Sequence, residues 1–147
     1  MPEFIVSPLY NDPDADVVLR SCDNVDFRLD KCILRRQSTF FRDMFTLPSQ
    51  GNEPQIVPVS ESATTLEDLL PFLYPGGRPE ILELSRLRAV LQAADKYDLA
   101  FLDDTLKTNL ALFLPSEPLR VYATAYIMED ASLAQAAAKC LLERPQF

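Results

Sequence analysis

Two kinds of hydrophobic periodicity follow one another along the chain, and this change constrains the fold more than any other feature. Short runs rich in alternating or β-branched apolar residues occupy 15–22 (A-D-V-V-L-R-S-C), 25–29 (V-D-F-R-L) and 55–59 (Q-I-V-P-V). Half-buried or fully buried strands have such patterns. Between and after these runs, apolar residues recur three to four apart, which is the spacing of helices. The sequence therefore predicts an α+β fold.

The first two expected strands are close enough to form a hairpin, with Asp23-Asn24 in its turn. Both residue types favour turns because their side chains hydrogen-bond locally and tolerate a left-handed backbone. The third strand contains Pro58, which has no N–H for a neighbouring strand, so we expect it at a sheet edge or strand end. Prolines mark the residues before 15, and we expect that segment to be irregular.

Helical spacing begins at Lys31 and continues to Phe45. Ser38 lies midway and can cap a second helix, so we expect two short consecutive helices in this segment. Several aromatic residues stand at helical spacing beside leucines and are expected in the core rather than on a ligand platform. They are Phe40, Phe41, Phe45, Phe72 and Tyr74.

A further helix should open at Thr64-x-x-Glu67, which has the spacing of a capping box, and continue through Leu73. Pro71 lies inside this helix and should distort its last turn, because proline cannot donate the helical hydrogen bond. Pro75-Gly76-Gly77 then ends the helix.

The second half of the chain is helical throughout, with apolar stripes flanked by charged residues. We expect Ser116 to cap the first of two final helices, and the small residues of the last helix to allow close packing. No repeat or long linker divides the chain, so one core is expected. The stripes are Leu84, Leu87, Val90, Leu91 and Ala94; Leu102, Leu106, Leu110 and Phe113; Leu119, Tyr122, Ala123, Tyr126 and Ile127; and Leu133, Ala136, Ala137, Cys140 and Leu141.

Acidic residues outnumber basic ones by 22 to 14, which gives a formal net charge of −8. This charge repels phosphate backbones and anionic membranes, so we expect no direct binding of nucleic acid. The cluster of Arg35, Arg36 and Arg42 has acidic and apolar neighbours, as in a mixed, solvated helix face. Without a cationic leader or an apolar run of roughly 18 residues, no membrane segment is expected, and we place the chain in the cytosol or nucleus.

The chain contains no histidine, which removes Ser-His-Asp and Cys-His pairs, histidine bases and nearly all catalytic zinc sites. Its three glycines build no phosphate-binding motif. The carboxylate pairs Asp103-Asp104 and Glu129-Asp130 are expected to stabilise helix starts rather than to catalyse. We therefore expect no catalytic residue, cofactor or metal, and a function in binding other proteins. An enzyme with converging carboxylates in a pocket is the alternative class.

One weak metal signal has a simpler explanation. Asp12, Asp14 and Asp16 have the alternate spacing with which a calcium loop begins. The turn glycine is replaced by Val17 and the closing glutamate by Asp23, which favours a solvated loop that leads into a strand.

The three cysteines, Cys22, Cys32 and Cys140, are an odd number without C-x-x-C spacing. This pattern fits neither a disulfide framework nor a zinc site, and it indicates a reducing compartment. A cationic neighbour such as Arg20 or Lys31 could make Cys22 or Cys32 reactive. We expect buried cysteines instead.

The ordered set of segments resembles the BTB/POZ domain, and particularly the form common in fungi. The matching segments are D-A-D-V-V-L-R-S (14–21), V-D-F-R-L-D-K-C-I-L (25–34), S-T-F-F-R-D-M-F (38–45), I-V-P-V-S-E (56–61), L-E-D-L-L-P-F-L-Y-P-G (66–76) and L-R-A-V-L-Q-A-A-D-K-Y-D-L (87–99). The likeness covers residues 7–143, and its specificity lies in the order of the segments.

The resemblance implies a small three-stranded sheet, open to added edge strands, that a cluster of helices covers. It divides the chain into an N-terminal arm (1–14), a BTB/POZ domain (15–113) and a C-terminal helical pair (114–147). That pair resembles the start of the BACK-like helical extension of larger proteins. Where the family pattern F-x-x-H has histidine, this chain has Asp30, which changes the polar contacts of the first helix.

Such domains commonly form twofold homodimers, and the resemblance carries two sets of site residues to this chain. Asp16 and Lys31 match a charged pair that lines the dimer pocket, with Cys32, Arg35 and Arg36 beside it; the alternative is that Asp16 and Lys31 form only an intrachain pair. Other members recruit a cullin scaffold of ubiquitin ligases through an apolar-x-acidic motif. The candidates here are Leu66 and Asp68, with Tyr74; alternatively, Leu66 belongs to the core and Glu67 caps its helix.

Overall fold

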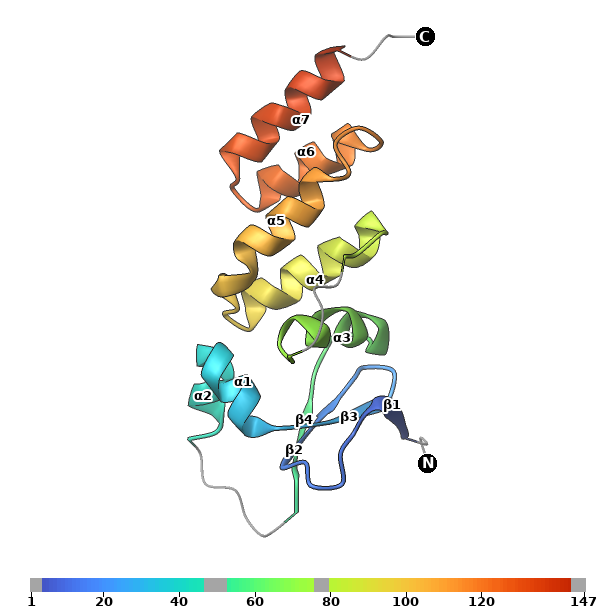
Figure 1. Cartoon of the computed structure of the whole chain (residues 1–147), viewed down its shortest axis with the longest axis vertical. Helices are drawn as coiled ribbons and strands as arrows, with labels where there is room; N and C mark the ends of the chain where they lie inside the picture. The colour runs from blue at the N-terminus through green and yellow to red at the C-terminus, as the bar shows by residue number, and fades with distance from the viewer. Residues whose placement is uncertain (1–3, 47–52, 76–79, 144–147) are drawn as a thin grey trace.

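A mixed four-stranded sheet lies at one end of the molecule, and helices stack away from it along the longest axis (Figure 1). The computed structural model describes residues 4–46, 53–75 and 80–143. In sheet order the strands are β1 (Ile5–Asn11), β3 (Val25–Leu29), β2 (Val17–Arg20) and β4 (Gln55–Pro58). The α+β architecture expected from the sequence is confirmed.

Strand β1 corrects the expectation of an irregular segment before residue 15. It pairs with β3 in parallel and enlarges the expected three-stranded sheet to four strands. The register shifts between Val6 and Asn11, the interval that contains Pro8, and prolines in strands belong at edges and irregularities. Ser7 is the one buried residue of this strand. The sequence showed no alternation here because hardly any side chain of β1 faces the core.

Strands β2 and β3 form the expected antiparallel hairpin. Asn24 in the turn has a φ of 64°, in the left-handed region that asparagine tolerates. The Asp23 carboxylate accepts hydrogen bonds from the Ser21 hydroxyl at 2.6 Å and from the Ala63 N–H at 2.9 Å. These bonds lower the pKa of Asp23 and join the turn to the segment that follows β4.

Strand β4 runs parallel to β2 at the outer edge of the sheet. The N–H groups of Gln55 and Val59 donate to carbonyls of the β2 segment. Because alternate residues of a strand face alternate edges, the nitrogen of Pro58 faces the open side. Pro58 thus removes a donor from the free edge, as expected from the sequence.

The two expected short helices are α1 (Lys31–Gln37) and α2 (Thr39–Met44), separated by Ser38. The Ser38 oxygen accepts a hydrogen bond from the Phe41 N–H at 3.1 Å, which confirms the cap, and the hydroxyl donates to the Tyr97 carbonyl at 2.6 Å. The Phe41 and Tyr97 rings stack with centroids 5.0 Å apart. Phe41 is buried in the core. The other aromatic residues expected there are partly buried and pack against the core: Phe40, Phe45, Phe72 and Tyr74.

Helix α3 (Ala63–Leu69) begins earlier than expected, because Ser62 and not Thr64 is its cap. Ser62 has an extended backbone, and its hydroxyl oxygen accepts from the Thr65 N–H at 3.3 Å. The expected capping box is therefore wrong by two residues. Pro71 lies in the short 3₁₀ helix η1 (Leu70–Phe72), where the α-helix ends as expected. Gly76 and Gly77 lie outside the described residues.

Helix α4 (Leu84–Lys96), the 3₁₀ turn η2 (Ala100–Leu102) and helix α5 (Asp103–Ala111) form the next layers. Their expected apolar stripes are buried, except for Phe113, which is partly buried. The buried Asn109 amide makes two hydrogen bonds with the backbone of Ile81, donating to its carbonyl at 2.9 Å and accepting from its N–H at 2.8 Å. These bonds hold the segment that leads into α4 against α5.

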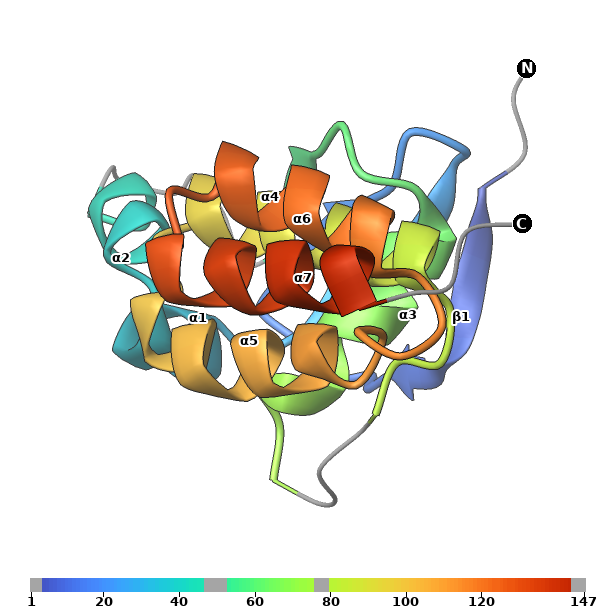
Figure 2. The same ribbon diagram turned by 90° about the horizontal axis from the view of Figure 1, so that it is seen from above.

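Helices α6 (Pro118–Ile127) and α7 (Ala131–Glu143) lie farthest from the sheet, side by side (Figures 1 and 2). Pro118 occupies the first turn of α6, a position that suits proline, and Glu117 precedes it as the cap residue. Ser116 is therefore not the cap that we expected; its hydroxyl donates back to the Phe113 carbonyl at 3.5 Å. Asp130 accepts from the Leu133 N–H at 3.2 Å and caps α7.

Candidate protein-interaction surface

Asp16, at the start of β2, fixes the position of α1. Its Oδ1 accepts a hydrogen bond from the Lys31 N–H at 2.7 Å, whereas Asp30, which directly precedes the helix, makes no side-chain cap. The Lys31 ammonium instead lies 5.3 Å from the centre of the Phe45 ring. The structure thus brings Asp16 and Lys31 together through the backbone, and in the described part of the chain their charged ends do not pair.

The outer face of α1 is exposed and cationic. Cys32, Arg35 and Arg36 are exposed, while Leu34 is fully buried on the inner side. Arg42 extends from α2 and donates to the Arg35 carbonyl at 3.3 Å. Within residues 4–46, 53–75 and 80–143, neither the Arg35 nor the Arg36 guanidinium has a hydrogen-bonded or ion-paired partner. Their charge is therefore not neutralised by any residue in these ranges.

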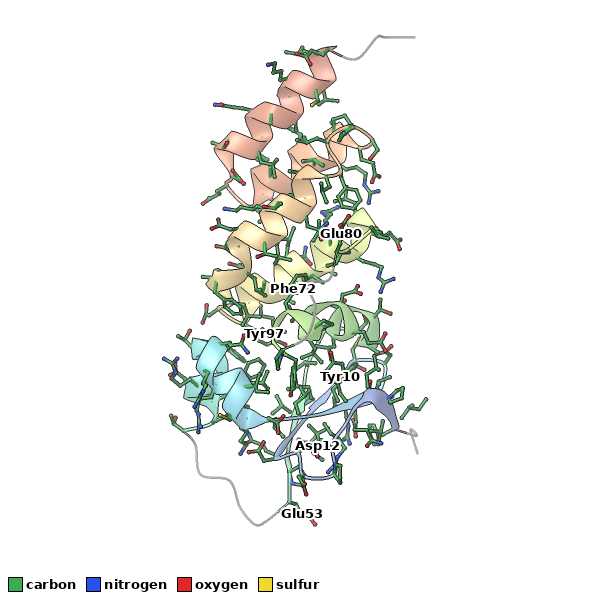
Figure 3. All side chains as sticks on the ribbon, viewed as in Figure 1. Tyr10, Asp12, Glu53, Phe72, Glu80 and Tyr97 are labelled. Atoms are coloured by element: carbon green, nitrogen blue, oxygen red, sulfur yellow. The ribbon has the colours of Figure 1, made fainter. Side chains whose placement is uncertain are left out.

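An acidic loop lies between β1 and β2, and its last residue, Asp16, contacts the start of α1. The Asp14 N–H donates to Asp12 Oδ1 at 2.9 Å, and Arg28 Nε donates to the Asp12 carbonyl at 3.0 Å. Backbone groups thus shape the loop, and the Asp12 and Asp14 carboxylates form no ion pair with any described residue. Figure 3 shows Asp12 at the sheet end of the molecule, away from the upper helices. No group of three possible metal ligands occurs among the described residues.

The cysteines correct one expectation. Cys22 follows β2 near the hairpin turn, Cys32 lies in the first turn of α1, and both are exposed free thiols; Cys140 is partly exposed. The expectation that Cys22 and Cys32 are buried is therefore wrong. In α1 the buried position belongs to Leu34, and Cys32, two positions earlier, faces solvent.

Each of the three candidate cullin-binding residues makes contacts within the chain. Leu66 is 1 % exposed and belongs to the core. The Asp68 carboxylate accepts two hydrogen bonds from the Arg86 guanidinium, from Nη2 at 2.6 Å and from Nε at 2.8 Å. The Tyr74 hydroxyl accepts from the Asp30 N–H at 3.1 Å. Desolvation raises the pKa of Tyr74 to about 12, so its hydroxyl keeps its proton at neutral pH.

The Glu61 carboxylate lies in a cluster with Tyr97 and Lys96 that has a structural role. Tyr97 donates a short hydrogen bond to Glu61, and the Lys96 ammonium lies 3.1 Å from the same carboxylate. Desolvation acts to raise the pKa of Glu61, but these two partners outweigh it and the pKa is lowered. Burial and Glu61 together raise the pKa of Tyr97. The cluster joins the end of α4 to the segment between β4 and α3.

Two exposed apolar surfaces were not identified as such from the sequence. On β1, Ile5 and Leu9 are 65 % and 81 % exposed. On α6, Leu119, Tyr126 and Ile127 are 65 %, 72 % and 67 % exposed. The signal for the second surface was present, because apolar residues lie on two sides of α6 whereas a helix on a core needs only one.

The comparisons with known proteins agree with this architecture. The family model of the BTB/POZ domain matches residues 9–112. Among solved structures, the BTB domain of zebrafish PATZ1 is similar, with a TM-score of 0.52 and 19 % identity, over 64 % of this chain and 73 % of that one. No curated protein gives a significant match.

The family match ends before α6, so the fungal form and the BACK-like extension stay predictions. None of the helices in the described part has an apolar stretch long enough to cross a bilayer. The family model matches most of the sequence, and the fold has the small sheet and the helical cover expected for this family. The chain belongs to the BTB/POZ family, whose domains mediate protein–protein interaction.

Proposed function

We propose that the chain is a homodimerising adaptor that pairs through Asp16, Lys31, Cys32, Arg35 and Arg36 and offers its remaining surface to a partner. One observation carries the proposal: the basic residues of α1 and the acidic residues Asp12 and Asp14 have no neutralising partner among the described residues, and Asp16, at the end of the acidic loop, contacts the start of α1.

In a dimer with a twofold axis, each contact between a basic and an acidic surface occurs twice. In an isologous dimer each copy presents the same patch, so the basic face of one copy meets the acidic loop of the other at two equivalent places. Exposed ion pairs are individually weak, and their main contributions are orientation and association rate. We therefore expect dimerisation to weaken as salt screens these charges.

Light scattering during size-exclusion chromatography tests the proposal. The wild type should approach twice the 16.6-kDa mass of one chain at a loading on the order of tens of micromolar. Arg36→Glu should shift association to higher concentration, because it places like charges opposite each other. Lys139→Glu is the matched control, since Lys139 is an exposed cation on α7. Equal masses for wild type and Arg36→Glu at every concentration contradict the proposed surface.

A charge-exchange experiment sharpens this test. The variant Arg35→Glu/Arg36→Glu and the variant Asp12→Lys/Asp14→Lys should each associate poorly alone. Mixed in equal amounts they should form a heterodimer, because the two reversed surfaces match each other and the two native surfaces still match. A mixture that behaves like the sum of its two components counts against this pairing.

A second proposal is recruitment of a cullin, which the helical pair α6–α7 directly after the matched domain favours. Pull-down with a purified cullin N-terminal domain tests it. The informative variant is Glu67→Lys on the exposed side of α3, because a charge at the buried Leu66 would unfold the protein. Absence of binding by the wild type removes this proposal and leaves the homodimer untouched.

A further inference from the structure

Two hydroxyl residues follow the arginine pair of α1 at a spacing that no other basic residue of the chain shares. Ser38 stands three residues after Arg35, and Thr39 stands three residues after Arg36. Of the 14 basic residues, these two alone have serine or threonine at the third position after them. Arginine-directed protein kinases recognise this arrangement, because carboxylates beside their active site pair with a guanidinium three residues before the acceptor hydroxyl. The sequence thus contains two candidate acceptors.

The fold leaves only Thr39 accessible. Ser38 is 1 % exposed, and its hydroxyl donates to the Tyr97 carbonyl at 2.6 Å while its oxygen accepts from α2. Thr39 is exposed, and its hydroxyl donates to the Asp98 carboxylate at the surface at 3.0 Å. Because an acceptor oxygen has to reach the γ-phosphorus of ATP, Thr39 is the available acceptor in the folded protein.

The arginines that such a kinase would bind are available as well. Arg35 and Arg36 are exposed, and their guanidinium groups have no partner in the described part of the chain. The backbone at Ser38 is extended, with φ of −131° and ψ of 118°, so the chain leaves helical geometry directly before Thr39. Helix α1 has only seven residues, a length that is marginal for a helix in water. Local opening of its last turn would place Arg36 and Thr39 in one extended segment.

We propose that Thr39 is a phosphorylation site for an arginine-directed serine/threonine kinase. The Thr39 oxygen attacks the γ-phosphorus of ATP, and the bond from that phosphorus to the oxygen that bridges it to the β-phosphorus breaks. ADP leaves, and the hydroxyl proton passes to the catalytic base of the kinase. The product carries about −1.5 to −2 charges at neutral pH where the hydroxyl had none.

The new phosphate acts on two neighbours. It removes the hydroxyl donor to Asp98 and places like charges together, so the contact between α2 and the end of α4 becomes repulsive. It also lowers the net positive charge of the face that carries Arg35 and Arg36. If this face pairs as proposed above, phosphorylation weakens the dimer; this consequence alone rests on the proposed function.

Incubation of the folded protein with ATP and the catalytic subunit of cyclic-AMP-dependent protein kinase tests the site. Mass spectrometry of the intact protein and of its peptides should find one phosphate, on Thr39, and none on Thr39→Ala. A synthetic peptide of residues 33–43 is the comparison, and there Ser38 should be labelled too because nothing buries its hydroxyl. Phosphate on Ser38 of the folded protein, or on neither residue, overturns the proposal.

Matched arginine variants test the recognition. Arg36→Gln should lower kcat/KM of the kinase about tenfold or more, because it removes the charge-assisted pair at the third position before Thr39. Arg42→Gln removes the same charge three residues after Thr39, on α2, and should change kcat/KM little. Equal losses in the two variants contradict recognition through the spacing.

Thermal unfolding tests where the phosphate lies. Phosphorylation should lower the melting temperature by about 2–6 °C in the wild type and by less in Asp98→Asn. This variant removes the like charge, and asparagine tolerates the left-handed backbone at this position, where φ is 55°. An equal shift in both proteins contradicts the repulsion from Asp98.

Light scattering separates this site from the proposed function. A dimer that becomes a monomer when Thr39 is phosphorylated supports both. A phosphorylated protein that keeps the dimer mass overturns the regulatory consequence. If the unmodified protein is a monomer at every concentration, the homodimer fails, whereas phosphate found on Thr39 still supports the modification site.

Discussion

The sheet with helices α1 to α5 and the terminal pair α6–α7 use apolar residues in different ways. In the first region each α-helix has at least one fully buried apolar residue, such as Leu34, Phe41, Leu66, Val90 and Leu106, and these residues belong to one core. In the second region α7 has Ala137 as its single buried residue, and the larger apolar side chains of α6 face outward. Similar composition thus serves folding in one region and leaves an exposed surface in the other.

This difference separates residues that the fold requires from residues that are available for partners. A side chain already removed from water gains nothing more from a second molecule, whereas an exposed one still can. Substitutions of buried apolar residues in the first region should therefore have large effects on stability and small effects on association, whereas substitutions of exposed apolar residues on α6 should have little effect on stability.

The largest expected effect compares two leucines of neighbouring helices. Leu106→Ala should lower the free energy of unfolding by about 2–5 kcal/mol, since Leu106 on α5 is fully buried and the change leaves a cavity. Leu119→Ala on α6 should stay within about 0.5 kcal/mol, because the side chain is 65 % exposed. Urea unfolding measures both. Similar losses for the two variants would mean that the Leu119 side chain packs against its own chain.

Asn109→Leu should destabilise the protein by about 1–3 kcal/mol, because it removes both hydrogen bonds to buried backbone groups of Ile81. Thr105→Leu, on the exposed side of the same helix, is the control and should have little effect. Thermal unfolding followed by circular dichroism reports the difference. No loss in Asn109→Leu would show that Asn109 does not anchor the segment before α4.

Ser38→Ala should cost about 1–2 kcal/mol, since Ser38 both caps α2 and donates to the Tyr97 carbonyl. Ser132→Ala, an exposed serine in the first turn of α7, is the comparison from the other region. Urea unfolding of the two variants side by side checks the prediction, and equal costs for both contradict it.

The smallest expected effect is on pH dependence. The pKa of Glu61 is lower in the folded than in the unfolded protein, so its contribution is present above the unfolded value and is lost as pH falls through the folded one. Glu61→Gln should therefore flatten the loss of stability on acidification. Glu129→Gln, at an exposed glutamate with no ion pair among the described residues, is the control variant. Urea midpoints across the acidic range test this, and parallel profiles for wild type and Glu61→Gln refute it.

Where local patterns and tertiary packing agree, the sequence was sufficient to predict the structure. The hairpin at Asp23-Asn24, the Ser38 cap and the end of the helix at Pro71 each follow from the chemistry of one or two residues. The edge position of Pro58 has the same origin, because a missing donor is a local property.

The expectations that the structure corrects share one cause: whether a residue is buried depends on which other elements pack against its own. Strand β1 shows no alternation because most of its residues face solvent. Cys22 and Cys32 are apolar enough for a core but lie on outward positions. The exposed apolar residues of α6, such as Leu119 and Tyr126, have the spacing of a core stripe. Periodicity indicates that a face is apolar, and only the packed fold tells whether anything covers it.

Pairing through α1 is the central claim, and a distance between two copies, measured from a label beside that helix, tests it directly. In a Cys22→Ser/Cys32→Ser/Cys140→Ser protein, a nitroxide label on Asp43→Cys, an exposed position of α2 outside the pairing surface, can be read by pulsed dipolar spectroscopy. We expect one defined distance between the labels of two molecules, and we expect it to vanish when Arg36→Glu is added. A signal that contains only the background of unassociated molecules, at concentrations where light scattering detects dimers, would show that the chain pairs through another surface.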